Sequence, residues 1–170
     1  KHVKENKRLS QVIKLAAEKS NWKNRNQTGK RQLGFATHTS FLASVAQVAD
    51  VSIENGQLKV HKVTCVIDCG SLVNPDIVKV QMESGIIFGL TAALHGEITL
   101  KDGVVTQSNF HDYPMLRMHE TPEIDVHIIE SNEKPTGVGE PGTPPIAAAV
   151  ANAIFAINGQ RLRSLPLKLS

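Results

Sequence analysis

The chain has 170 residues, of which 41% are hydrophobic and 21% are charged, and its formal net charge is +3. These values are typical of a folded domain with a sizeable core and exclude a disordered chain. The charge excess is small and no basic motif with interleaved aromatic residues occurs, so nothing indicates binding to nucleic acid. No uninterrupted apolar run reaches the ~18 residues that a membrane-spanning helix requires.

The first part of the chain predicts one helix followed by a β region. Residues 1–8 are basic and polar, and we expect them to be disordered. Residues 10–22 carry apolar side chains on one side, which predicts an amphipathic helix. Two candidate strands follow within residues 31–53. Asn55-Gly56 is a typical tight-turn pair, so the second of these strands should form a long antiparallel hairpin with residues 58–68.

The two cysteines do not form a disulfide framework. Cys65 and Cys69 lie four residues apart on the predicted strand, roughly 13 Å, which is too far for a disulfide bond. Their spacing also differs from the CxxC redox motif, so we interpret both as small buried residues. The seven histidines are scattered and include no HExxH motif, so no metal ion ligated directly by the protein is expected.

A second helix is predicted from Pro75 to Leu94. Asn74 suits the N-cap, proline suits the first helical position, and Gly96 lies just beyond the end. The segment is apolar on nearly every side, a pattern that indicates burial. Gln81, Ser84, Gly85 and Gly89 fall at helical spacing on one face. The small residues allow a close approach and the amide needs a hydrogen-bond partner, so this is either a ligand-binding face or a packing face.

The middle of the chain is less regular. Residues 97–107 predict a hairpin that turns at Asp102-Gly103. Residues 108–122 form a long irregular stretch, and residues 123–130 alternate as a strand does. The irregular stretch is either a surface loop or a functional one. Its polar candidates are His111, Asp112 and Arg117.

The stretch from Pro135 to Gly159 combines a stiff loop with an apolar helix. After Pro135, its first half surrounds one carboxylate, Glu140, with three glycines and three further prolines: Gly137, Gly139, Gly142, Pro141, Pro144 and Pro145. Prolines restrict the backbone and glycines allow a ligand to come close, so the acid sits on a rigid elbow suited to proton transfer. The simpler alternative is a stiff turn with an ordinary solvated glutamate. A helix over residues 145–158 follows, and residues 161–167 are a short strand or an extended tail.

These elements predict an α+β fold. Hairpins of an antiparallel or mixed sheet pack with two buried helices, and no regular βαβ alternation occurs. We interpret residues 1–170 as a single domain.

Three segments occur in an order that resembles a known family: VIDCGSLVNPDIVKVQMESGIIFGL, then SNFHDY, then GVGEPGTPPIAAAVANAIFAINGQRLRSLPL. They resemble the C-terminal part of the molybdopterin-binding large subunits of the xanthine dehydrogenase/aldehyde oxidase family. Within it they resemble most the branch of isoquinoline 1-oxidoreductase β subunits and related aldehyde dehydrogenases. The resemblance implies a molybdenum cofactor-binding domain and a C-terminal module of a larger subunit.

The resemblance also implies site residues and a reaction. Glu140 corresponds to a general base that takes a proton from a molybdenum-bound hydroxide, whose oxygen attacks an aldehyde or N-heterocycle carbon. Hydride then passes to the Mo=S group, and water supplies the oxygen. Gly139 corresponds to the backbone position beside the metal. Gln81 corresponds to a glutamine that contacts the pterin, with Ser84 and Gly85 beside it; many relatives have glycine where this chain has Ser84.

The implied cofactor is molybdopterin with molybdenum, expected in its cytosine dinucleotide form, in the intact subunit and not bound to this chain alone. The implied partners are the remaining domains of the large subunit, an iron–sulfur small subunit and the aldehyde or N-heterocycle substrate. Relatives are often exported, which leaves the compartment open. An alternative is a non-catalytic binding or assembly module that kept the fold, and a third is a plain structural domain.

Overall fold

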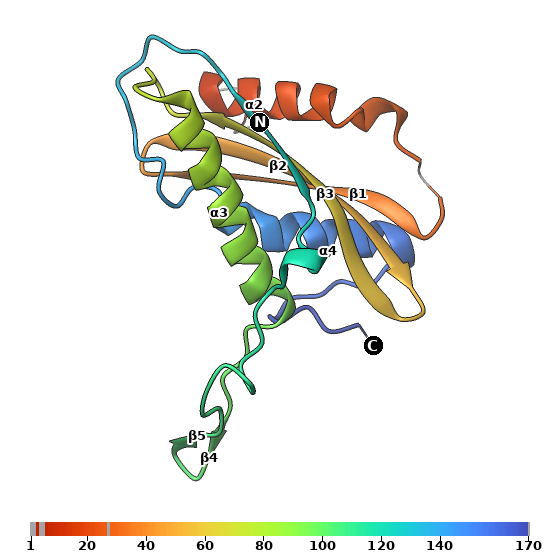
Figure 1. Ribbon diagram of the computed structural model, residues 1–170. Helices are drawn as coiled ribbons and strands as arrows, with labels where there is room; N and C mark the ends of the chain where they lie inside the picture. Colours follow the sequence, from red (N-terminus) through yellow and green to blue (C-terminus); the bar gives the residue numbers. More distant parts are fainter. Residues whose placement is uncertain (1–2, 4–5, 27, 170) are drawn as a thin grey trace.

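The computed structural model describes residues 3, 6–26 and 28–169 (Figure 1). Its helices are α2 (Lys7–Lys19), α3 (Pro75–Leu94) and α4 (Pro144–Asn158), with short 3-10 turns η1 (Trp22–Asn24) and η2 (Met118–Glu120). Its strands are β1 (Arg31–Ser40), β2 (Ala43–Glu54), β3 (Gln57–Asp68), β4 (Leu100–Lys101), β5 (Val104–Val105) and β6 (Glu123–Ile128).

The core is a four-stranded sheet with helices on both faces. The strand order is β1-β2-β3-β6; the first three strands are antiparallel and β6 runs parallel to β3. Alternation along β2 separates the faces: Ala46 and Val48 pack under α2, whereas Val45 and Ala49 pack with α3 and α4. Figure 1 shows α2 and α4 on opposite sides of the sheet. The α+β prediction is therefore confirmed.

The predicted β2–β3 hairpin is confirmed, and so is the prediction that the two cysteines are buried and form no disulfide bond. The β2–β3 pair turns at Asn55 and Gly56, both with positive φ. Cys65 and Cys69 are free and buried. Burial raises the pKa of the Cys65 thiol to about 12.

Helix α3 forms as its end signals predict. The Asn74 side chain accepts hydrogen bonds from the backbone N–H groups of Asp76 and Ile77, and Pro75 opens the helix. Among the described helices, α3 alone is long and apolar enough to cross a membrane by length and composition. The same test is met by core helices of soluble proteins, and one face of α3 packs into the main core through Met82, Ile86 and Leu90.

Helix α4 lies unusually close to β1. A Cβ atom on Gly34 would lie 2.0 Å from the carbonyl oxygen of Ala149, so only glycine permits this contact. The Asn152 side chain donates to the Phe35 carbonyl oxygen at 2.9 Å. The position of α4, and of the loop that precedes it, is thus tied to the sheet.

Several boundaries differ from the predictions. The expected disorder of residues 1–8 does not hold at Lys7 and Arg8, which form the first turn of α2; residues 1, 2, 4 and 5 lie outside the described part. Of the two alternatives predicted for residues 161–167, the described residues form no strand, which leaves the tail, and the Leu167 N–H donates to the carbonyl oxygen of Ala93 at 2.7 Å.

Candidate active site

The loop that carries Glu140 is held in place on its N-terminal side by two turns of the sheet. We call residues 137–143 the elbow. The Gly137 N–H donates to the carbonyl oxygen of Phe41 at 3.2 Å, in the β1–β2 turn. Just before it, the backbone and side chain of Thr136 both donate to the Cys69 carbonyl oxygen, at 2.9 and 3.0 Å. The elbow therefore begins from a fixed point at the end of the sheet.

The C-terminal side of the elbow is held by a strand and a helix. The side-chain amide of Gln47 in β2 donates to the Gly142 carbonyl oxygen at 2.7 Å. The Thr143 hydroxyl donates to the Gly85 carbonyl oxygen in α3 at 3.1 Å, and its N–H donates to the Glu140 carbonyl oxygen at 2.9 Å. Glu140 thus lies between two anchored ends, as a stiff elbow requires.

Two glycines of α3 make room for the end of the elbow. A Cβ on Gly85 would lie 3.2 Å from the Thr143 hydroxyl, and one on Gly89 would lie 2.7 Å from the Thr143 carbonyl oxygen. A Cβ on Gly142 would in turn lie 3.0 Å from the Met82 carbonyl oxygen. The small residues on this side of α3 therefore serve the packing of the chain's own elbow.

The predicted site residues lie on α3 and on the elbow, with different exposure. Glu140 and Gly139 are exposed, and no protein atom lies within 4 Å of a Cβ built on Gly139. Gln81 is half-buried and Ser84 is exposed, whereas Gly85 is buried under Thr143. Of the three on α3, only Gly85 has a contact with the elbow among those that the structure gives, and it is made with Thr143. Binding and catalysis by these five residues remain predictions.

The three polar candidates of the irregular stretch have local partners instead. Asp112 accepts hydrogen bonds from the backbone N–H groups of Asn109 and Ser108, at 2.9 and 2.8 Å, which lower its pKa to about 2. His111 lies 3.6 Å from the Asp112 carboxylate. The Arg117 N–H donates to Glu120 at 2.8 Å. These contacts order the loop itself.

A partly buried ion pair supports the turns that anchor the elbow. Arg8 donates to the Asp68 carboxylate at 2.8 Å and to the Leu42 carbonyl oxygen at 3.0 Å. The Gly70 N–H also donates to Asp68, at 3.1 Å. Burial opposes ionisation of Asp68, but the hydrogen bonds from Arg8 and Gly70 hold the pKa of this carboxyl below its usual value.

The sequence predictions did not include Gln47 or the Arg8–Asp68 pair. Gln47 was detectable, because it is a polar residue in a valine-rich strand at a position whose neighbours two residues away are apolar. Arg8 was not, because its partner lies sixty residues further along the chain. Because residues 1–8 were expected to be disordered, no partner was predicted for Arg8.

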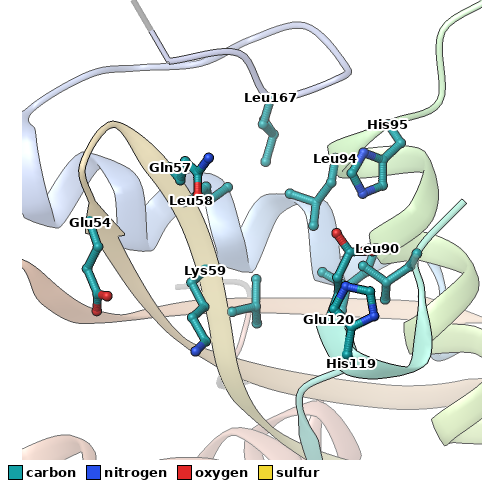
Figure 2. Close-up of a pocket in the computed structure, with 12 residues that line it drawn as sticks. Glu54, Gln57, Leu58, Lys59, Leu90, Leu94, His95, His119, Glu120 and Leu167 are labelled. Atoms are coloured by element: carbon teal, nitrogen blue, oxygen red, sulfur yellow. The ribbon is translucent and has the colours of Figure 1, made fainter. Parts of the chain in front are cut away.

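Two cavities lie at opposite ends of α3. One of about 340 Å³ is lined by Cys69, Leu72, Ile77, Thr136 and Val138 among others, beside the start of the elbow. Another, of about 470 Å³, is shown in Figure 2 between the β2–β3 hairpin, the end of α3 and η2. This cavity is lined by several leucine side chains and by four polar or charged ones, from Glu54, Lys59, His119 and Glu120. None of the five predicted site residues lines either cavity, and the exposed Glu140 of the anchored elbow, not a cavity, is the reason that we place the candidate site there.

Within the described residues, no group of three or more His, Cys, Asp or Glu side chains gathers in a way that could hold a metal ion. The structure thus defines an α+β domain in which an anchored loop carries one exposed carboxylate, Glu140.

Comparison with known proteins identifies the kind of cofactor. The molybdopterin cofactor-binding domain family matches residues 2–122. The chain is 42% identical to the isoquinoline 1-oxidoreductase β subunit of Brevundimonas diminuta, over 98% of this chain and 22% of that protein. It is 34% identical to a membrane-bound aldehyde dehydrogenase [pyrroloquinoline-quinone] of Gluconacetobacter polyoxogenes, over 95% of this chain and 22% of that protein.

A solved structure has the same fold. The aldehyde oxidoreductase of Desulfovibrio desulfuricans matches with a TM-score of 0.64 and 27% identity, over 73% of this chain and 14% of that chain. The chain belongs to the molybdopterin cofactor-binding domain family, and it is similar to part of the large subunits of xanthine dehydrogenase-type oxidoreductases. It spans about a fifth of the length of the isoquinoline 1-oxidoreductase β subunit and of the membrane-bound aldehyde dehydrogenase.

Proposed function

We propose that this chain forms one wall of the molybdenum site of a hydroxylase that oxidises an aldehyde or an N-heterocycle, with Glu140 as the general base. The observation that carries the proposal is the anchored elbow. Hydrogen bonds fix it at Gly137, Gly142 and Thr143, while Glu140 between them stays exposed. An exposed carboxylate on a fixed backbone is suited to accepting a proton from a bound reactant.

The residues beside Glu140 fit the edge of a molybdopterin cofactor. The side-chain amide of Gln81 makes no hydrogen bond within the described part of the chain, and Ser84 is exposed beside it. These two side chains would bind polar atoms of the pterin, and the bare backbone at Gly139 would let the cofactor approach. We propose the cytosine dinucleotide form. When bound, the cofactor supplies a redox centre that accepts two electrons from the substrate.

In the proposed reaction an aldehyde and water give a carboxylic acid, two electrons and two protons. Glu140 would accept one of these protons from the water-derived oxygen as that oxygen attacks the substrate carbon. Because the elbow backbone is held on both sides, only the side chain of Glu140 would have to be ordered during the reaction, and the smaller ordering cost lowers the barrier. The buried side of the elbow would keep the base in one orientation.

The rest of a large subunit would complete the site. The side chains of Ile77, Val80 and Phe88 on α3 are 54%, 56% and 72% exposed, and exposed apolar side chains on one helix favour contact with another domain. We propose that further domains of the subunit cover this surface. An iron–sulfur subunit would carry the electrons away, and the substrate would enter between the domains.

The test compares the assembled, molybdenum-loaded enzyme with its Glu140→Gln variant in an aldehyde turnover assay, with molybdenum content measured in parallel. Glutamine keeps the size of the side chain but removes the base, so kcat should fall by ~10² or more at equal molybdenum content. Glu130→Gln, which removes another exposed carboxylate ten residues upstream, is the matched control and should leave kcat unchanged.

An unchanged kcat in Glu140→Gln would overturn the role of Glu140. Absence of molybdenum from the wild-type protein, with the elbow intact, would favour the alternative of a non-catalytic binding or assembly module.

A further inference from the structure

A buried polar side chain lies under the elbow. Gln47 in β2 is fully buried, on the sheet face that packs with α3 and α4. Its neighbours on that face of the strand, Val45 and Ala49, belong to the main hydrophobic core. Placing an amide there costs free energy unless its polar atoms find partners.

The partners of Gln47 are few and point to the elbow. Its side-chain nitrogen donates to the Gly142 carbonyl oxygen at 2.7 Å and makes a long contact of 3.9 Å to the Cys65 sulfur. Its side-chain oxygen has no partner within the described residues. A carbonyl oxygen can only accept, so the amide must present its nitrogen to Gly142. Gly142 is itself buried, so the hydrogen bond also keeps its carbonyl oxygen from being left unpaired.

We infer that Gln47 is a positioning residue for Glu140; this inference rests on the proposed function. The hydrogen bond fixes the carbonyl group of Gly142, two residues after Glu140. The intervening residue, Pro141, is buried and has a restricted φ. Fixing Gly142 therefore limits the orientations open to the Glu140 backbone. The sheet thus sets the direction of the catalytic carboxylate through one buried amide.

The first test measures steady-state kinetics of the assembled holoenzyme with Gln47→Met, which keeps the approximate shape and removes the donor. We expect kcat to fall about tenfold or more at unchanged molybdenum content, because small displacements of a catalytic group have effects of this size. KM should change little. The matched control is Gln32→Met on the neighbouring strand: Gln32 is also buried, but donates to Gly29, far from the elbow.

Amide hydrogen exchange provides a readout that does not depend on activity. The Thr143 N–H, which donates to the Glu140 carbonyl oxygen, should exchange faster in Gln47→Met than in the wild type. It should be unaffected in Gln32→Met.

The second variant, Gln47→Glu, adds a titratable donor. A buried carboxyl group has a raised pKa, and only its protonated form can donate to Gly142. Activity should therefore be near that of the wild type at low pH and fall as the pH rises through that pKa. This is opposite to the rise in activity expected when a general base such as Glu140 loses its proton.

The outcomes separate the two proposals. Wild-type kcat in a molybdenum-loaded Gln47→Met enzyme would overturn the positioning role, and so would an equal loss in Gln32→Met. If the methionine variant does not fold or load molybdenum, the Gln47→Glu profile decides, and a profile parallel to that of the wild type overturns the inference. Full activity of Glu140→Gln would overturn the proposed function itself, whatever Gln47 does.

Discussion

The elbow and the β4–β5 arm are both irregular segments punctuated by glycine, yet the structure holds them in different ways. We call residues 98–115 the arm. The elbow is bonded to β1–β2, β2 and α3 at Phe41, Gln47 and Gly85. The arm projects from the body of the molecule (Figure 1), and the hydrogen bonds of Thr99, Thr106 and Asp112 stay within it. A loop is therefore held rigidly against the domain when its hydrogen-bond partners lie in the sheet and helices, and less so when they lie within the loop itself.

This difference separates two uses of an irregular segment. The sheet and α3 fix the backbone from which a carboxylate in the elbow extends. A general base requires a fixed backbone position of this kind. The arm exposes Leu100, Val104 and Phe110, at 69%, 67% and 71%. Such a surface is suited to contact with another domain. Four substitution experiments sharpen the comparison.

The largest effect is expected from a matched pair of glycines. Gly70 and Gly103 have nearly the same backbone angle, with φ of +78° and +80°. A Cβ on Gly70 would lie 2.1 Å from the Lys134 carbonyl oxygen, just before the elbow, whereas nothing lies within 4 Å of one on Gly103. Gly70→Ala should cost about 2–4 kcal/mol in the free energy of unfolding, through strain and displacement of the backbone. Gly103→Ala should cost about 1–2 kcal/mol, through strain alone. Urea denaturation measures both, and equal losses would contradict the close approach.

Arg8→Met removes the ion pair behind the turns that anchor the elbow. Asp68 is only 1% exposed, so the variant leaves a buried carboxylate without its main partner. We expect a loss of about 1.5–3 kcal/mol at neutral pH.

The pH dependence of this loss follows from the lowered pKa of Asp68. The stabilising contribution is present above the unfolded-state pKa of about 4 and is lost as the pH falls through the lower folded-state value. Thermal unfolding of wild type and variant between pH 7 and pH 2 should converge at acid pH. A constant difference in stability across this range would contradict the ion-pair explanation.

Thr143→Val tests the contact between the elbow and α3. Valine keeps the shape and removes the hydroxyl that donates to the Gly85 carbonyl oxygen, so stability should fall by about 1 kcal/mol. Thr106→Val is the control in the arm, where the hydroxyl is exposed, and it should change stability by less than about 0.5 kcal/mol. Chemical denaturation distinguishes the two, and a larger loss in the arm would reverse the comparison.

The smallest global effect is expected from Asp112. Its carboxylate caps the loop at Ser108 and Asn109, and its pKa is lowered to about 2. The ordering it provides is therefore complete above about pH 4 and lost as the pH falls through about 2. Asp112→Asn should speed amide exchange at Ser108 and Asn109 while protection in β2 and β3 is unchanged. Faster exchange in the core would show that the arm is coupled to it.

Local signals in the sequence determined much of the fold. Asn74 and Pro75 begin α3, Asn55-Gly56 closes the long hairpin, and Gly159 ends α4 in a left-handed conformation. Each of these acts over a few residues, so the sequence alone is sufficient to predict it. The stiff elbow around Glu140 was predictable for the same reason, since prolines and glycines restrict or free the backbone locally.

Only the tertiary structure decided what surrounds the elbow. The parallel pairing of β6 with β3, the Arg8–Asp68 ion pair and the Gln47–Gly142 hydrogen bond each join residues at least fifty positions apart. The face of Gly85 and Gly89, open in the sequence to either a ligand or a packing partner, is covered largely by Thr143 and Ile146. Such contacts depend on how the packed layers meet, because side chains distant in the sequence become neighbours only when the whole core has formed.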